Sequence, residues 1–201
     1  MPTERRQLRG TVLVEDRRTE RFFRELLVHL GFELQKLYFR PAPKGQGDAK
    51  AWIRAQSQYP SEVRKLRQKR FQQVFLITVM DGDNADPVRR KAELDSCLQG
   101  QSMDPRQPDE RIAIPVPTWS IETWLLALLG DSVDEATSQK REFERRYPGQ
   151  EERRALRNAA IAWDRLRRRA AALRWESGAY PSSSVPSLAD SKIEMRRIGV
   201  A

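Results

Sequence analysis

The feature that most constrains the fold of this chain is the apolar run 75–80, Phe-Leu-Ile-Thr-Val-Met, which leads into the polar turn Asp81-Gly-Asp-Asn84. An apolar run of this length with β-branched residues is typical of a strand that is buried on both faces of a parallel sheet. Two aspartates separated by one residue in extended chain point the same way, about 6 to 7 Å apart, since a strand rises about 3.3 Å per residue. The segment therefore predicts either an ordinary turn with capping chemistry or a pair of carboxylates that helps to hold a divalent cation.

Strand and helix patterns alternate on both sides of this run. Residues 11–14 predict a first strand that ends at Glu15, and residues 20–30 carry a helical apolar stripe that stops at Gly31. The other elements that we expect up to residue 130 are strands over 32–39 and 111–116 and helices over 49–59, 61–73, 87–98 and 117–129. This alternation predicts an α/β fold over residues 1–130, with a mainly parallel sheet flanked by helices.

The composition changes after Gly130. Helical patterns cover 133–147 and 150–175, a linker rich in Pro, Ser and Gly follows over 177–187, and a short helix is expected over 188–198. The long helix carries apolar residues on one stripe and arginines mostly off it, so its basic face is either solvated or in contact with nucleic acid. We expect residues 131–201 to form a basic helical region that packs on the sheet domain.

The charge balance favours a polyanionic partner. The chain has 37 Lys and Arg against 28 Asp and Glu, a net charge of +9, and guanidinium groups bind phosphates bidentately. The alternative is a generally basic protein in which Arg replaces Lys, with connector loops and solvated helix faces. The candidate nucleic-acid-binding residues lie in the loop 41–48, on the helix 61–73 and on the long helix, and they are Lys44, Arg64, Lys65, Arg157 and Arg168.

Several classes of site are excluded by composition. Cys97 is the only cysteine and His29 the only histidine, which excludes disulfide frameworks, structural zinc sites and catalysis by Ser-His-Asp or Cys-His. His29 is expected to have a structural role at a helix end. No apolar run approaches the roughly 18 residues of a membrane span, and the first residues lack the apolar core of a signal peptide. We therefore expect a cytoplasmic protein that does not bind membranes.

The remaining chemistry is that of carboxylates. In an open α/β sheet, functional groups gather at the carboxyl ends of the strands, where Glu15, Asp81 and Asp83 are expected. Glu122, in the first turn of the helix 117–129, joins them if its end of the helix faces that edge. Magnesium prefers hard oxygen ligands, and such a set predicts a site for Mg²⁺ or Mn²⁺ that activates water for phosphodiester cleavage. Each residue also has a plain interpretation as a capping or first-turn carboxylate.

Three of these segments resemble a known family. The strand ending at Glu15 and the Asp81-Gly-Asp83 turn resemble the TOPRIM domain, in which a Glu after the first strand and an Asp-x-Asp after a later strand bind magnesium. Glu15-Asp-Arg-Arg-Thr-Glu20 and Glu122-Thr-Trp-Leu-Leu126 extend the match to OLD-type nucleases and RloB-like abortive-infection proteins of phage defence. The resemblance covers roughly residues 11–130.

The resemblance implies a magnesium-dependent nuclease that acts on DNA or RNA in bacterial anti-phage defence. It implies Glu15 as a metal ligand or general base, Asp81 and Asp83 as metal ligands, Glu20 as a second-site ligand and Glu122 as a catalytic carboxylate. Lys44 and Lys192 are the candidates for a cation that stabilises the transition state. Trp119 and Trp124 are expected in the core rather than as platforms on which bases stack.

One departure from the family leaves a second interpretation open. The family usually has Gly directly after the first Glu, whereas this chain has Asp16. If that position needs a positive φ, Asp16 adds strain; it is alternatively an additional ligand. The competing hypothesis is a catalytically degenerate TOPRIM module that binds nucleic acid without cleaving it, or that binds a separately encoded ATPase, because this chain has no Walker motif. A primase-like nucleotidyl transferase is the further alternative for the function. For the partners, a second copy of the same chain, in a homo-oligomer, is a further alternative.

Overall fold

A four-stranded parallel sheet lies at the centre of the computed structural model, which describes residues 8–43, 49–54, 57–172 and 185–200. The strands run in the order β2-β1-β3-β4, and each is parallel to its neighbours. Their bounds are β1 Arg9–Val14, β2 Leu37–Pro41, β3 Val74–Val79 and β4 Ile112–Ala113. The predicted α/β class with a parallel sheet is confirmed, and the apolar run 75–80 supplies most of the central strand β3.

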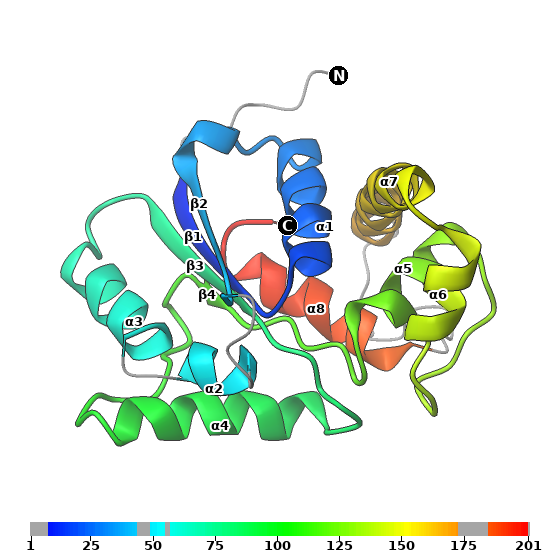
Figure 1. The fold of residues 1–201 in the computed structure, drawn as a ribbon. Coiled ribbons are helices and arrows are strands. Elements are labelled where there is room, and N and C mark those ends of the chain that lie inside the picture. The colour runs from blue at the N-terminus through cyan, green and yellow to red at the C-terminus, as the bar shows by residue number, and fades with distance from the viewer. Residues whose placement is uncertain (1–7, 44–48, 55–56, 173–184, 201) are drawn as a thin grey trace.

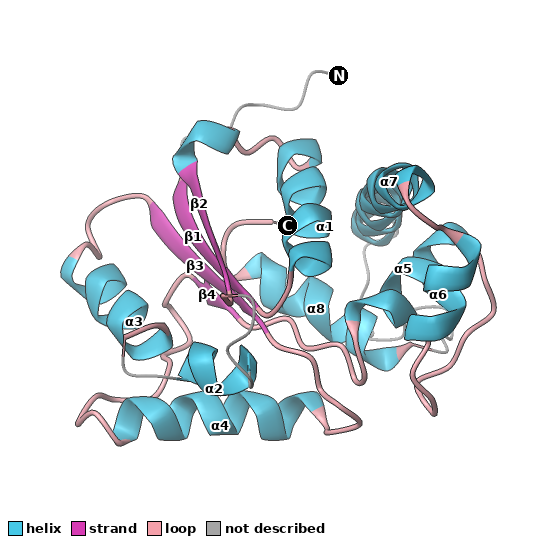
Figure 2. Cartoon of the chain, in the orientation of Figure 1, coloured by secondary structure: helices cyan, strands magenta, loops and turns pink. Residues whose placement is uncertain are grey.

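Helices cover both faces of the sheet (Figures 1 and 2). Alternate side chains of β3 enter two separate hydrophobic clusters, since Phe75 and Ile77 belong to one and Leu76 and Met80 to the other. The Leu76 cluster packs under α2 (Ala49–Arg54), α3 (Tyr59–Gln68) and α4 (Pro87–Gln99). The Phe75 cluster packs under α1 (Arg17–His29), α5 (Ile121–Leu129) and α8 (Pro186–Arg196). The burial of β3 on both faces explains its continuous apolar sequence.

The long helix α7 (Gln150–Ala172) packs along α1 and α5, and the short helix α6 (Lys140–Arg146) lies beside α5. Leu156, Ala160 and Trp163 of α7 and Phe143 of α6 are buried in the same cluster as Phe75. Exposed arginines of α7 lie outside this contact: Arg153, Arg154, Arg157 and Arg165. The apolar stripe of the sequence is therefore the contact face, and residues beyond Gly130 complete the core on one side of the sheet.

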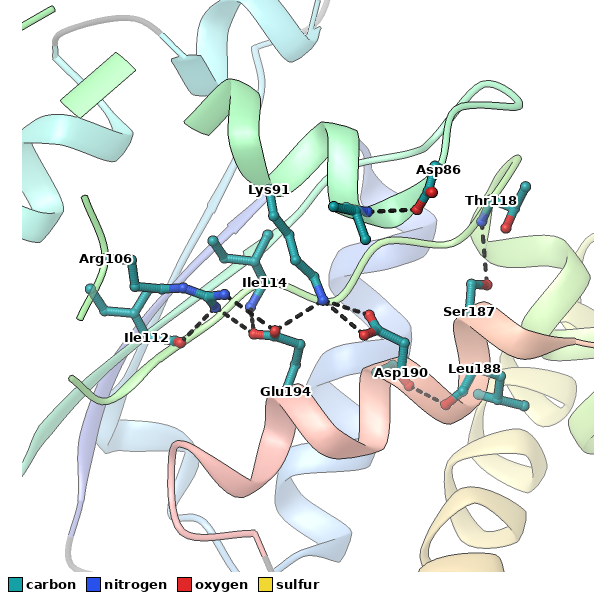
Figure 3. Close-up of polar contacts among 12 residues, drawn as sticks. Asp86, Lys91, Arg106, Ile112, Ile114, Thr118, Ser187, Leu188, Asp190 and Glu194 are labelled. Carbon is teal, nitrogen blue, oxygen red and sulfur yellow. Dashed lines mark hydrogen bonds and ion pairs between the residues drawn. The ribbon is translucent and has the colours of Figure 1, made fainter. Parts of the chain in front are cut away.

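Helix α8 covers the outer edge of the sheet (Figure 3). The Glu194 carboxylate accepts a hydrogen bond from the backbone N–H of Ile114 at 2.9 Å and pairs with Arg106 and, at 3.0 Å, with Lys91. Burial would raise the pKa of Glu194, but the arginine hydrogen bond and these positive charges hold it below its usual range. A side chain of α8 thus replaces the strand partner that the edge of β4 lacks.

The strand predicted over 111–116 is wrong in extent, because β4 contains only Ile112 and Ala113. The N–H of Ile114 is taken by Glu194, and Pro115 and Pro117 have no N–H with which to extend a ladder. The strand predicted over 32–39 is also shifted. Residues Leu34–Lys36 form a short 3-10 helix, and the ladder of β2 with β1 begins where Leu37 meets Gly10.

Other element boundaries differ from those expected. The helix predicted over 61–73 spans Tyr59–Gln68 instead, because Pro60 fits the first turn of α3, where its missing N–H needs no partner. The predicted helix over 133–147 is confined to α6, because residue Glu135 lies in a loop in which its carboxylate accepts hydrogen bonds from Ser187 and Thr118. The linker predicted over 177–187 lies mainly outside the described residues. Along the described ranges of the chain, we find no helix with the length and apolar content of a membrane span.

Candidate functional site at the carboxyl ends of the strands

The order of the strands places a topological switch point between β1 and β3, the position at which open α/β sheets form their ligand crevice. The chain leaves β1, forms β2 on one side of it and returns to form β3 on the other side. Ligands of open α/β sheets bind at such switch points, outside the carboxyl ends of the strands. Val14 pairs with Val79 at the last position of the β1–β3 ladder, so Glu15 and Asp81 both lie just beyond it.

Glu15 and Asp81 are in direct contact across this crevice. Oε1 of Glu15 accepts a hydrogen bond from the backbone N–H of Asp81 at 2.8 Å. Both side chains are partly exposed, as carboxylates that receive a ligand from solvent must be. The structure therefore brings the Glu15 carboxylate to the backbone of Asp81, and these two predicted residues come from segments 66 positions apart.

The turn after Asp81 is held by backbone hydrogen bonds to the segment that precedes α5. The N–H of Gly82 donates to the carbonyl of Pro117 at 2.8 Å, and the N–H of Asn84 donates to that of Thr118 at 2.7 Å. A Cβ at position 82 would lie 2.2 Å from the Thr118 oxygen, so only glycine fits there. These contacts also explain why the predicted helix over 117–129 begins only at Ile121, since the backbone of 117–119 is paired with the turn.

Asp83 lies on the exposed side of this turn. Its φ is 50° and that of Asn84 is 67°, a left-handed conformation that Asp and Asn tolerate better than most residues. The guanidinium of Arg90, on α4, donates two hydrogen bonds to the carbonyl of Gly82, at 2.8 and 3.2 Å. The turn is therefore fixed from two sides. Sequence reasoning did not single out Arg90, and the only signal for it was the glycine that requires close backbone contact.

Asp16 is the N-cap of α1. Its carboxylate accepts a hydrogen bond from the N–H of Thr19 at 2.7 Å, and its φ of −141° is ordinary extended backbone. The position that is usually glycine in TOPRIM proteins thus needs no positive φ here. The expected backbone strain is absent, and the Asp16 carboxylate is used for capping.

Glu122 is held in the interior by Arg18. The Glu122 side chain is 2% exposed and is paired with the Arg18 guanidinium, which also reaches Glu144 at 3.3 Å and Glu152 at 3.4 Å. Burial alone would lower the pKa of Arg18, but the hydrogen bonds and charges of Glu122 and Glu152 raise it. These contacts connect α1 with α5, α6 and α7. The structure therefore gives Glu122 a structural ion pair that links helices.

Glu20 is likewise paired with arginines. Its carboxylate lies 2.7 Å from Arg17 and 2.8 Å from Arg24, and its side chain is 8% exposed. Burial opposes ionisation, but both arginines hold the pKa of Glu20 below its usual range. A carboxylate that already has two cationic partners is a poor second-site metal ligand, because the metal must displace them.

The fit to a metal ion therefore rests on Glu15, Asp81 and Asp83. Their oxygens are the hard donors that Mg²⁺ prefers, and Mg²⁺ is commonly held by one or two carboxylates, with waters and substrate phosphates in the other positions. Within the described part of the chain, no three Asp, Glu, His or Cys side chains are close enough to hold an ion together. The donor set is thus suited to an ion that water and substrate help to coordinate.

The predicted basic residues are scattered. Arg64 and Arg157 are exposed on α3 and α7, and Lys65 pairs with Glu62 at 2.7 Å. Lys44 and the side chain of Arg168 lie outside the part of the structure that is described. Lys192, the other candidate cation, is 5% exposed on α8, and burial lowers its pKa to about 8.

The tryptophans support the loop around the site. Trp124 is buried and donates its Nε1–H to Ser187 Oγ at 2.7 Å, and Trp119 donates to the carbonyl of Glu135 at 3.0 Å. His29 lies 3.4 Å from the buried carboxylate of Asp164, at the end of α1. The expected structural roles of Trp124 and His29 agree with these contacts.

Comparison of the chain with protein-family models, with curated proteins and with solved structures finds no match.

Proposed function

We propose that this protein is a Mg²⁺- or Mn²⁺-dependent nuclease of the TOPRIM type, which cleaves phosphodiester bonds of DNA or RNA. A role in anti-phage defence is part of the proposal and comes from the resemblance to OLD-type and RloB-like proteins. The observation that supports the nuclease is the contact between Glu15 and the backbone of Asp81 at the switch point of a parallel sheet.

In this proposal the carboxylates of Glu15, Asp81 and Asp83 supply one or two ligands to the ion, and water and a substrate phosphate complete its coordination. A bound Mg²⁺ supplies a Lewis acid for a phosphoryl oxygen and lowers the pKa of its bound water. The contribution of the chain is to fix the carboxylates: the Asp81 turn is held by the segment 117–119 and by Arg90. The partial exposure of Glu15 and Asp81 leaves the crevice open to a phosphate group.

The test is cleavage of plasmid, single-stranded DNA and RNA in Mg²⁺ and in Mn²⁺. We expect Asp81→Asn combined with Asp83→Asn to reduce cleavage at least about 100-fold, since a lost metal ion costs several kcal/mol of transition-state stabilisation. Asp104→Asn, at an exposed position away from the crevice, is the matched control. Cleavage that survives the double substitution would exclude the proposed site.

A second candidate function is a degenerate TOPRIM module that binds nucleic acid, or a separately encoded ATPase, without cleavage. It is favoured by the arginine pairing of Glu20 and Glu122, which removes two of the acidic side chains from the proposed catalytic set. Calorimetry should then detect no Mg²⁺ binding in the low millimolar range, while electrophoretic shifts show binding to nucleic acid that weakens with salt. A metal-dependent cleavage product would exclude this alternative.

A further inference from the structure

Two hollows adjoin at the end of the sheet opposite to the carboxylate site. The first, about 260 Å³, lies between α3 and the first residues of β1, β2 and β3. The second, about 570 Å³, lies between the loop that follows α3 and residues 107–111. Leu66, Gln72 and Val74 line both hollows, so they are two halves of one surface, beside the α3–β3 loop at the left of Figure 1.

Each hollow carries an exposed aromatic ring. Tyr38 of β2 lines the first and is 66% exposed, and Phe71 lines the second and is 89% exposed. The guanidinium carbon of Arg70 lies 4.8 Å from the centre of the Phe71 ring. Rings as exposed as these contribute little to the core, and their free faces are available for stacking.

Positive charge dominates the same surface. The carboxylate of Glu62 is neutralised by Arg40 at 2.8 Å and Lys65 at 2.7 Å, and that of Glu110 is paired with Arg67 at 2.6 Å. The cations that form no ion pair with another described residue are Arg9, Lys69, Arg70 and Arg111. Asp109 also lines the second hollow, but these four cations outnumber it, and the surface is therefore complementary to a polyanion.

We propose that this surface binds single-stranded nucleic acid, with phosphates on Arg9, Lys69, Arg70 and Arg111 and bases stacked on Phe71 and Tyr38. The aromatic rings decide the class of ligand, because the bases of a duplex are stacked on one another and present no free face. The inference rests on the proposed function, since it names the class of substrate. The six residues of β1 separate the two ends of the sheet by about 20 Å. This surface therefore anchors the nucleic acid at a distance from Asp81 and takes no part in the reaction.

The test is fluorescence anisotropy with an oligothymidylate of about 20 nucleotides and a duplex of the same length. We expect tighter binding of the single strand, and a loss of about tenfold or more in its affinity when Phe71→Ala and Tyr38→Ala are combined, since base stacking on aromatic rings contributes this much. Tyr38→Phe keeps the ring and should bind as the wild type does. Val88→Ala, which truncates a 69% exposed side chain on α4, is the control and should change affinity less than about twofold.

Lys69→Ala combined with Arg70→Ala should weaken binding of both ligands and flatten its salt dependence. Equal affinity for single strand and duplex, or an unchanged affinity in the variant without the two rings, would overturn the inference. Circular dichroism melting verifies that each variant is folded.

Cleavage of the small diester bis(p-nitrophenyl) phosphate in Mn²⁺ separates this inference from the proposed function, because so small a substrate does not need the anchoring surface. If cleavage depends on Asp81 but the affinity for the single strand does not depend on Phe71 and Tyr38, the binding surface is wrong and the proposed nuclease function stands. If binding depends on the two rings but no metal-dependent cleavage occurs, the binding surface is supported and the proposed nuclease function is wrong.

Discussion

Arg18 of α1 and Glu122 of α5, 104 positions apart in the sequence, form an ion pair in the interior of the protein. The pair joins the helix that follows β1 to the helix that follows β4, and both helices pack on the face of the sheet that contains Phe75. Glu122 therefore supports the site through packing, although the Glu-x-Trp-Leu-Leu motif that contains it resembles a catalytic segment.

Glu122→Gln is expected to destabilise the fold by about 2–4 kcal/mol, because it leaves the Arg18 charge only partly compensated in a buried environment. Glu144→Gln removes a partner of the same arginine whose side chain is 47% exposed, and it should cost less than about 1 kcal/mol. Urea unfolding measures both. If Glu122→Gln retains full stability but loses cleavage, Glu122 is catalytic and the packing role is wrong.

Gly82→Ala is expected to reduce both stability and cleavage. The new methyl group would lie 2.2 Å from the Thr118 carbonyl, and the Asp81 turn must move away from the segment 117–119 to accommodate it. We expect a loss of about 1–3 kcal/mol, the usual cost of overpacking, and a weaker binding of Mn²⁺ in calorimetry. Gly100→Ala is the control, since its Cβ would lie 3.4 Å from its nearest neighbour and should be tolerated.

The buried Lys192 should make stability depend on pH. Burial lowers its pKa from 10.5 to about 8, so the unfolded chain binds more protons than the folded protein between these two values. The free energy of unfolding should therefore rise by about 2 kcal/mol between pH 7 and pH 9.5. Lys192→Met should increase stability at pH 7 and abolish this rise, as measured by urea unfolding at several pH values. Lys91→Met, which removes a lysine from an ion-paired position, is the comparison and should leave the rise intact.

Glu194→Gln should loosen α8 from the edge of the sheet. The carboxylate accepts the N–H of Ile114 and compensates Arg106 and Lys91, so we expect a loss of about 2–4 kcal/mol. Hydrogen exchange at the Ile114 amide should accelerate, because its acceptor becomes weaker. Asp190→Asn changes a 33% exposed partner of Lys91 and should have a smaller effect. Equal effects of the two variants would contradict the role assigned to Glu194.

Much of the fold could be predicted from the sequence, because buried parallel strands and amphipathic helices have local periodicities. The sequence also predicted that Glu15 and Asp81 lie at the same end of the sheet, since residues that follow parallel strands lie at one edge. The boundaries of predicted elements were wrong where a residue far away in the sequence takes the backbone hydrogen-bonding groups of the segment. Residues 117–119 resemble the start of a helix but pair with the Asp81 turn, and the 111–116 strand ends early because Glu194 takes the N–H of Ile114.

The sequence by itself determined the α/β class, the buried strand β3 and the gathering of strand-end carboxylates at one edge of the sheet. Only the tertiary structure decided what each charged side chain does there. Glu15 contacts Asp81, Glu20 and Glu122 are paired with arginines, and Asp16 caps α1. The physical reason is that periodicity and turn chemistry are properties of neighbouring residues, whereas the partner of a charge is set by the packing of elements that are far apart in the chain.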